Sequence, residues 1–329
     1  MSRLIPIAAL AALGFVASTN AVGDDLEGRV TATDGWVAYR VPMIAGVDPP
    51  CCYSVYDGTA TQKGCDLDGR SWSFASDHDD LAVAPDGTLA MYFRVEHGRV
   101  ERVRAVAASC PVHTGSIVRW IDSIDPAKSV AMLSSLLDRK TADTEDGGLV
   151  AIAYHADASA TGALTARVER SHSFKEREQA LFWLGLTRGA EGANVVEHYA
   201  TTNADPQLRA KAIFALTQSK VPGVYAHILT MAQDDPAEDV RAQAFFWLVH
   251  MDDAHAKDDI MASLKTEGSD RVRAQAVFAL SQLRNGTADD ALIAVLRGDY
   301  PRAAKKSAVF WLGQSGTPQA VAYFDEVLK

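Results

Sequence analysis

The chain has 329 residues, of which 48% are apolar and 22% are charged, and its formal net charge is −10. This composition is that of a folded protein with room for two domains, and it excludes bulk disorder. The acidic balance argues against a nucleic-acid binder, because such proteins need a basic face that displaces phosphate counterions.

The first 23 residues have the pattern of an export signal. Arg3 precedes an apolar run from Leu4 to Ser18, and the small residues Ala21 and Gly23 follow where a signal peptidase would cut. The run is short for a bilayer core of about 30 Å. We therefore predict a signal peptide over residues 1–23 and a periplasmic or secreted protein, with a membrane anchor or a buried helix as the alternatives. No later stretch predicts a membrane span.

Residues 24–115 predict a small antiparallel β domain. Residues 36–41 read as a strand that ends at Pro42, and residues 88–95 alternate in the period of a strand. The His97-Gly98 turn leads to a third strand over residues 100–106, which predicts a hairpin. Residues 116–144 predict a helix and a linker, with Asp125 as the cap and Pro126 as the first helical residue.

All four cysteines lie in this N-terminal part of the chain. An even count in an exported domain predicts disulfides. Neighbours in a strand point to opposite faces, so Cys51 and Cys52 should have different partners. Of the three connectivities, we favour Cys52–Cys65 across a hairpin together with Cys51–Cys110. A zinc site built from the cysteines and His113 is the alternative, although the spacing lacks paired short knuckles.

Two charged segments are weaker candidates for binding. Asp77-His78-Asp79-Asp80 could hold a cation, although a solvated acidic loop is the simpler interpretation. A basic cluster on the predicted hairpin could contact an acidic partner, or it could guard an exposed strand against aggregation. Its members are Arg94, Arg99, Arg102 and Arg104.

Residues 145–329 repeat themselves with a spacing of 32 residues. The repeating motif is Ala-x-Phe-x-Leu, with a cation three residues before each Ala. Such self-similarity indicates stacked helix pairs. Because the Phe faces away from the Ala and Leu side, we expect a first helix that is buried on both sides. The predicted repeat core is Ala180, Phe182, Leu184, Ala212, Phe214, Leu216, Ala244, Phe246, Leu248, Ala276, Phe278, Leu280, Ala308, Phe310 and Leu312.

The residue after each anchor Phe alternates between Trp and Ala. The series is Trp183, Ala215, Trp247, Ala279 and Trp311. We interpret it as compensation of large by small side chains between adjacent core layers. The alternative is an aromatic ladder that lines a groove.

A degenerate unit precedes the first clear one, with Val150, Ile152, Leu164 and Val168 in register. Terminal repeats are usually atypical because they close the stack. In the last helix, Asp325 stands where inner units have Leu229, Met261 and Ile293, as an outer face requires.

The Arg-x-x-Ala-x-x-x-Leu element, as in Arg241-Ala244-Leu248, resembles the HEAT repeat. The short units are similar to those of phycobiliprotein lyases. The Ala-x-Phe-Trp-Leu-Gly form at residues 180–185 and 308–313 resembles a group of exported bacterial HEAT-repeat proteins. The resemblance implies an α+β multidomain chain, with the β domain followed by an α-α superhelix (a HEAT-like solenoid) over residues 145–329. It also implies a scaffold that binds a partner along one curved face, or a chromophore partner if the lyase branch applies.

No nucleophile elbow, phosphate-binding loop, His-Glu-x-x-His or Cys-x-x-Cys motif occurs in the sequence. We therefore predict no catalytic, cofactor-binding or metal-binding residue, and no cofactor. The predicted function is an exported scaffold or adaptor for a protein partner of unknown identity. The alternatives are a lyase-like or other enzyme, and an inhibitor or sensor of an envelope protein.

Overall fold

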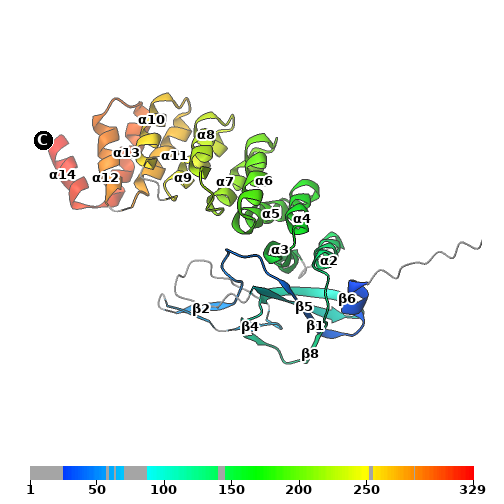
Figure 1. The fold of residues 1–329 in the computed structure, drawn as a ribbon. Coiled ribbons are helices and arrows are strands. Elements are labelled where there is room, and N and C mark those ends of the chain that lie inside the picture. The colour runs from blue at the N-terminus through cyan, green and yellow to red at the C-terminus, as the bar shows by residue number, and fades with distance from the viewer. Residues whose placement is uncertain are drawn as a thin grey trace, which may run out of the picture.

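The computed structural model describes residues 25–56, 59–62, 64–69, 87–139, 145–251, 255–284 and 286–329. A sheet region at one end is followed by an array of paired helices that extends away from it (Figure 1). The predicted signal peptide and the Asp77–Asp80 segment lie outside the described residues. Among the described helices, none combines the length and the apolar character needed to cross a bilayer.

The main sheet has four strands in the order β6-β5-β1-β8. The strands are β1 (Gly35–Pro42), β5 (Thr88–Glu96), β6 (Arg99–Ala107) and β8 (Val118–Trp120). The predicted hairpin is present as β5–β6, and His97 and Gly98 both have positive φ at its turn. Positive φ at both central residues gives the turn the twist that a two-residue hairpin needs.

The sheet region is not purely antiparallel. β8 pairs parallel with β1, and β4 (Cys65–Asp66) pairs parallel with β7 (Val112–His113). The strands β2 (Tyr53–Tyr56) and β3 (Thr59–Gln62) form a separate antiparallel pair. β8 comes from the segment in which the sequence predicted only a helix and a linker, since three residues are too few to show a strand period.

The two disulfides join Cys51 to Cys110 and Cys52 to Cys65, the pairing that the sequence favoured. The Cys52–Cys65 bond encloses the β2–β3 hairpin. The sulfur atoms of Cys65 and Cys110 are 3.8 Å apart, so the two bonds lie side by side in the core. On the chain-entropy model, these loops of 13 and 59 residues stabilise the fold by about 3 and about 4 kcal/mol.

Helices cover the sheet and join it to the repeats. The helix α1 (Leu26–Thr31) precedes β1, and α2 (Pro126–Arg139) begins at the predicted Pro126. The hydroxyl of Tyr39 on β1 lies 2.8 Å from that of Ser129 on α2, inside the core. The next helix, α3 (Glu145–Tyr154), packs against β6 and α2 on one side and against the first clear repeat on the other. The core is therefore continuous from the sheet into the helical array.

The junction holds a buried histidine and a buried arginine. His155 follows α3 and has no exposed surface. Burial lowers its pKa to about 4, so the imidazole is neutral at neutral pH. Arg188 donates to the carbonyls of His155 and Asp157 at 2.7 and 3.2 Å and to the hydroxyl of Thr161 at 3.0 Å. These bonds tie the degenerate unit to the unit that follows it.

The predicted helix pairs are present along the rest of the chain. The degenerate unit is α3 with α4 (Ser159–Arg170), and the five clear units follow in order. Their first helices are α5 (Phe174–Thr187), α7 (Pro206–Thr217), α9 (Glu238–Leu248), α11 (Asp270–Ser281) and α13 (Arg302–Ser315). Their second helices are α6 (Gly189–Thr202), α8 (Val224–Asp234), α10 (Ala256–Thr266), α12 (Thr287–Arg297) and α14 (Pro318–Val327).

The helices form two layers. The first helices pack directly against one another along the array, whereas the second helices lie further apart (Figure 1). Because the first helices are the closer-packed layer, we call α5, α7, α9, α11 and α13 the inner helices. The inner helices touch protein on one side and solvent on the other.

Every anchor Ala and Leu is buried, but the prediction that the five anchor Phe are core residues is wrong. Phe182, Phe214, Phe246 and Phe278 are half-buried, and Phe310 is 56% exposed. In the first four units the buried residue is the one before the Phe, namely Leu181, Ile213, Phe245 and Val277, whereas Val309 of the last unit is exposed. The reason is geometric: burial on both sides of the inner helix would need a third layer, and the array has two.

Arginines at the predicted cation positions join successive loops. Arg209 donates to both oxygens of Asp235 at 2.9 and 2.8 Å and to the carbonyl of Asn203 at 2.7 Å. Arg241 repeats the arrangement with Glu267, at 2.8 and 3.0 Å, and with the carbonyl of Asp235 at 2.7 Å. Each carboxylate lies in the loop between two units, so these charged hydrogen bonds link one junction to the next.

Gly185 and Gly313 occupy equivalent positions in two repeats, but only Gly185 lies close to the next unit, so substitution by Ala should change stability differently at the two sites. A Cβ on Gly185 of α5 would lie 2.0 Å from the carbonyl oxygen of Ala215, whereas one on Gly313 of α13 would meet nothing within 4 Å. Gly185→Ala should therefore destabilise the protein by about 2–4 kcal/mol. Gly313→Ala should be neutral or stabilising by up to about 1 kcal/mol. Urea unfolding measures both, and equal effects would contradict the described stacking.

The Arg241–Glu267 pair predicts an acid-dependent contribution to stability. Burial alone would raise the pKa of Glu267, but the hydrogen bonds from Arg241 and the Ser269 backbone N–H outweigh burial, and the net pKa is lowered. A carboxylate with a lowered pKa stabilises the fold above its unfolded value near 4.5, and that contribution is lost as the pH falls. Glu267→Gln should cost about 3 kcal/mol at pH 7 and much less near pH 3.

The matched control is Glu238→Gln, because Glu238 pairs with Arg271 at the surface, where the two side chains are 45% and 53% exposed. It makes the same chemical change and should alter the free energy of unfolding little at either pH. A Glu267→Gln cost that does not change with pH would contradict the assignment.

Candidate binding face

An unbroken chain of aromatic rings runs along the inner helices. It begins at Tyr154 of α3, whose ring centroid is 5.7 Å from that of Trp183. Phe182 then stacks on Phe214 of the next helix at 5.7 Å, and Phe214 reaches Trp247 at 4.8 Å. An aromatic ladder is therefore present on the inner helices, but its members in the groove described below are Phe246 and Phe278 and not the Trp residues of the alternating series.

The chain of rings continues to the last unit. Phe246 stacks on Phe278 at 6.3 Å, and Phe278 meets Trp311 at 4.8 Å. Within a unit, neighbouring Phe and Trp rings contact each other edge to face, as Phe246 and Trp247 do at 5.1 Å. Such ring pairs contribute about 0.5–1.5 kcal/mol each beyond the burial of their area. The ladder thus stiffens the inner layer while its rings stay partly accessible.

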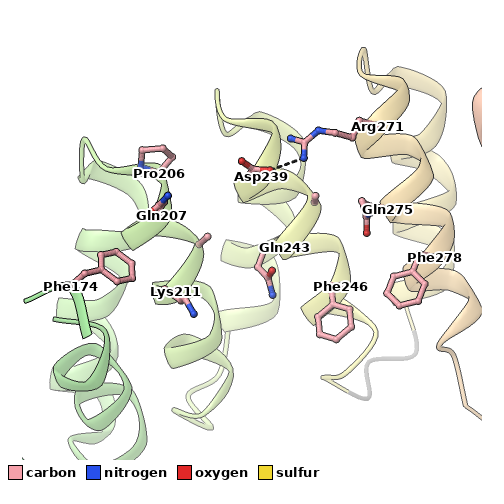
Figure 2. A pocket seen from close by; sticks show the side chains of 12 residues that line it. Phe174, Pro206, Gln207, Lys211, Asp239, Gln243, Phe246, Arg271, Gln275 and Phe278 are labelled. Atoms are coloured by element: carbon pink, nitrogen blue, oxygen red, sulfur yellow. Dashed lines mark hydrogen bonds and ion pairs between the residues drawn. The ribbon is translucent and has the colours of Figure 1, made fainter. Parts of the chain in front are cut away.

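A groove of about 630 Å³ crosses the inner helices beside this ladder. Phe174 of α5 lies at one end and Phe278 of α11 at the other, and Phe246 of α9 lies beside Phe278 (Figure 2). Ala210 and Ala242 also line it. Because Ala side chains project little from the helix, they do not block the groove, which continues from one helix to the next.

Polar side chains follow the rings one helical turn away. On α7, α9 and α11 the equivalent positions hold Lys211, Gln243 and Gln275 (Figure 2). A carboxamide has an oxygen that accepts and an NH₂ group that donates two hydrogen bonds. A row of such groups can pair with both the N–H and the C=O of another polypeptide backbone.

The charged groups that line the groove are already paired. Lys211 lies 2.7 Å from the carboxylate of Glu178 on α5. Arg271 of α11 is 2.7 Å from Asp239 and 2.9 Å from Glu238 of α9, and the Asp239 contact is drawn in Figure 2. The groove therefore presents apolar rings, amides and neutralised ion pairs rather than a field of one sign.

Further hollows open elsewhere among the described residues. One, of about 660 Å³, is lined by Arg241 and Glu267, which the fold already uses to join its loops. Another, of about 450 Å³, lies between α6 and α8 beside the His227–Glu197 pair. Neither is lined by the repeating aromatic residues. The inner groove is the hollow that combines rings, amides and the repeat period, so it is the candidate binding face.

The candidate metal ligands are occupied by other bonds. Within the described residues, the cluster of potential metal ligands is Cys51, Cys65 and Cys110, and all three are in disulfides. The two disulfides leave no thiolate to bind zinc while they are intact.

The basic cluster of the hairpin is partly structural. Arg102 donates to the carbonyls of Leu67, Asp68 and Gly69 at 3.2–3.4 Å. Arg104 is buried, and Arg94 bonds Glu96 at 3.2 Å. Arg99 is exposed at the hairpin end. The four arginines therefore do not form one open basic surface.

Sequence reasoning missed the polar row of the groove. Gln243 and Gln275 are equivalent residues in the 32-residue register, and Lys211 takes the same position in the unit before them. The signal was therefore present in the alignment of units. The sequence alone did not show that this position faces a groove, so the polar row could not be assigned to a binding surface.

The paired helices, the two layers and the continuous inner groove define an α-helical repeat protein that carries a sheet region at its N-terminal end. Residues 161–249 and 225–313 match the family model for HEAT repeats. This part of the chain is therefore an array of HEAT repeats.

The solved structure of human deoxyhypusine hydroxylase in complex with glycerol is similar at 17% sequence identity. The match covers 59% of this chain and 75% of that chain, with a TM-score of 0.25. No curated protein matches the sequence.

Proposed function

We propose that this protein is an exported scaffold or adaptor that holds an extended segment of a partner protein in the inner groove. The observation that carries the proposal is the aromatic ladder with its parallel amide row. Apolar rings provide contact area, and amides provide backbone hydrogen bonds at intervals set by the repeat. A helical repeat scaffold is the use to which the HEAT array itself points.

The length of the groove fits a short extended segment. Packed helices lie about 8–10 Å apart, so the distance from α5 to α11 is roughly 25–30 Å. An extended chain advances about 3.3 Å per residue and would place roughly eight residues along it. Because Lys211, Asp239 and Arg271 are neutralised within the face, the segment should be recognised by apolar side chains and by its backbone rather than by its charge.

The same features favour a scaffold over an enzyme. Catalysis by general acid and base needs ionisable groups that converge on one point with perturbed pKa values. The charged side chains of the groove instead form ion pairs with neighbouring helices. An inhibitor or a sensor would use the same groove, so the binding experiment below applies to each of these roles.

The first test is selection of binding peptides on the purified chain, from a library of random twelve-residue sequences. Affinity is then measured by calorimetry and by the fluorescence of Trp247 and Trp311, whose rings lie in the ladder. The double variant Phe246→Ala/Phe278→Ala should bind at least tenfold more weakly, because removing anchoring aromatics typically costs more than 1 kcal/mol each.

Gln243→Ala should weaken binding about fivefold, through the loss of one or two backbone hydrogen bonds. Its matched control is Gln233→Ala on the outer helix α8, which should leave the affinity unchanged. Selected peptides that bind the double Phe variant as tightly as the native chain would contradict the proposal, and so would a selection that yields no peptide.

The disulfides support the location that we propose, a periplasm or the space outside the cell. Cys51, Cys65 and Cys110 are buried and Cys52 is partly buried, and disulfides persist in oxidising compartments. Alkylation of free thiols in intact cells, followed by mass spectrometry, should leave all four cysteines of the native protein unmodified. Modification of Cys51 or Cys110 in a folded protein taken from its native compartment would contradict this location.

A further inference from the structure

The outward side of the last helix pair exposes apolar residues. Val309 and Phe310 of α13 are 48% and 56% exposed, and Val327 and Leu328 at the end of α14 are 53% and 83% exposed. We call these four residues the end face. They come from two consecutive helices, because α13 and α14 form a helical hairpin joined at Gly316, which has a positive φ.

Equivalent positions in the inner units are the interface between units. Val309 corresponds to Leu181, Ile213, Phe245 and Val277, each of which is at most 1% exposed. Val327 corresponds to Met231 and Val295, which are also buried. The other two equivalents of Val327 are Ser263, which is buried, and Tyr199, which is half-buried. Helices of each inner unit pack against the first helix of the following unit. Val309, Val327 and Leu328 thus continue the inter-unit interface, with no described unit against them, whereas Phe310 is equivalent to the half-buried ladder rings and lies at the edge of the end face.

The two ends of the array differ in this respect. At the N-terminal end, α3 is covered by β6 and α2, and its residues Leu149 to Tyr154 are all buried. The sheet therefore completes that end of the stack. The end face at the other end consists of exposed apolar side chains, and no described unit packs against them.

The charges around the end face are arranged in a self-complementary way. The first half of α13 carries Arg302, Lys305 and Lys306, and the last turn of α14 carries Asp325 and Glu326. Glu326 is paired with Arg297 of α12 at 2.7 Å, so Asp325 is the acidic group that the contact uses. Because the two helices run in opposite directions, these basic and acidic groups lie at the same end of the hairpin. A two-fold axis parallel to the helices would place α13 against α14 of a second molecule, so that Lys306 faces Asp325 in both halves of the contact.

We propose that the end face binds the end face of a second copy of this chain. The contact buries Val309, Phe310, Val327 and Leu328 of both molecules, with α13 of each packed antiparallel on α14 of the other. The charged residues form its rim, which favours this register over the contact of α13 with α13. This assembly is independent of the peptide groove, and it doubles the number of grooves in one particle.

The test is the molecular mass of the full chain in solution, by sedimentation equilibrium from about 1 to 200 μM. The native chain should be a concentration-dependent dimer. Val327→Asp and Val309→Asp should each weaken the dimer at least tenfold, because they bury a charge in its apolar centre. The matched control is Ala322→Asp, an exposed position on the same helix where inner units have Asp258 and Asp290. It should leave the dimer unchanged.

A charge exchange tests the register directly. Lys306→Glu and Asp325→Lys should each weaken the dimer several-fold, and the double variant should recover most of the loss because the pair is restored with its signs reversed. Circular dichroism verifies that each variant is folded.

A native chain that stays monomeric up to 200 μM would overturn the proposal and leave the end face to a different protein or to a further segment. A dimer that survives both Val variants would also overturn it, since the contact would then lie elsewhere.

Discussion

The array depends on one constraint, which is that each helix pair can bury its Ala and Leu residues only when a neighbouring pair covers them. A single pair has too little apolar surface to be stable alone, so stability grows with stacking. Gly185 shows how close the stacking is, since its Cα faces the carbonyl of Ala215 with no space for a methyl group. The charged links from Arg209 to Asp235 and from Arg241 to Glu267 then fix the angle between successive units.

The sequence predicted the helical repeats well because the 32-residue period samples every position five times. Ala180 and Leu184 are buried as expected, and so are their equivalents. The side of the helix on which Phe182 lies was a harder question. Period alone shows that Phe182 and Ala180 point in different directions, but it does not show whether a further layer covers the Phe. The number of layers is a tertiary property, and it decides whether such a ring is core or surface.

Other features depended on contacts between distant residues. The cation of each unit was visible in the sequence, but the acidic partner of Arg241 is 26 residues away at Glu267 and is not the same residue type in every unit. The short strand β8 forms because β1 has a free edge beside it, which three residues of sequence do not reveal. The disulfide pairing could be predicted because neighbouring strand residues point to opposite faces, which gives Cys51 and Cys52 different partners and leaves few possible connectivities.

The alternation of Trp and Ala along the ladder has a consequence for how the array can change in length. Phe214 lies between Phe182 and Trp247, and Phe278 lies likewise between Phe246 and Trp311. The units of Phe214 and Phe278 are the ones that carry the small Ala215 and Ala279. Loss of a single unit would bring two Trp layers or two Ala layers together, giving a clash in one case and a void in the other. Loss or duplication of two units together preserves the order of layers. The natural unit of growth for this protein is therefore a pair of repeats, and related arrays of different length should differ by even numbers of helix pairs.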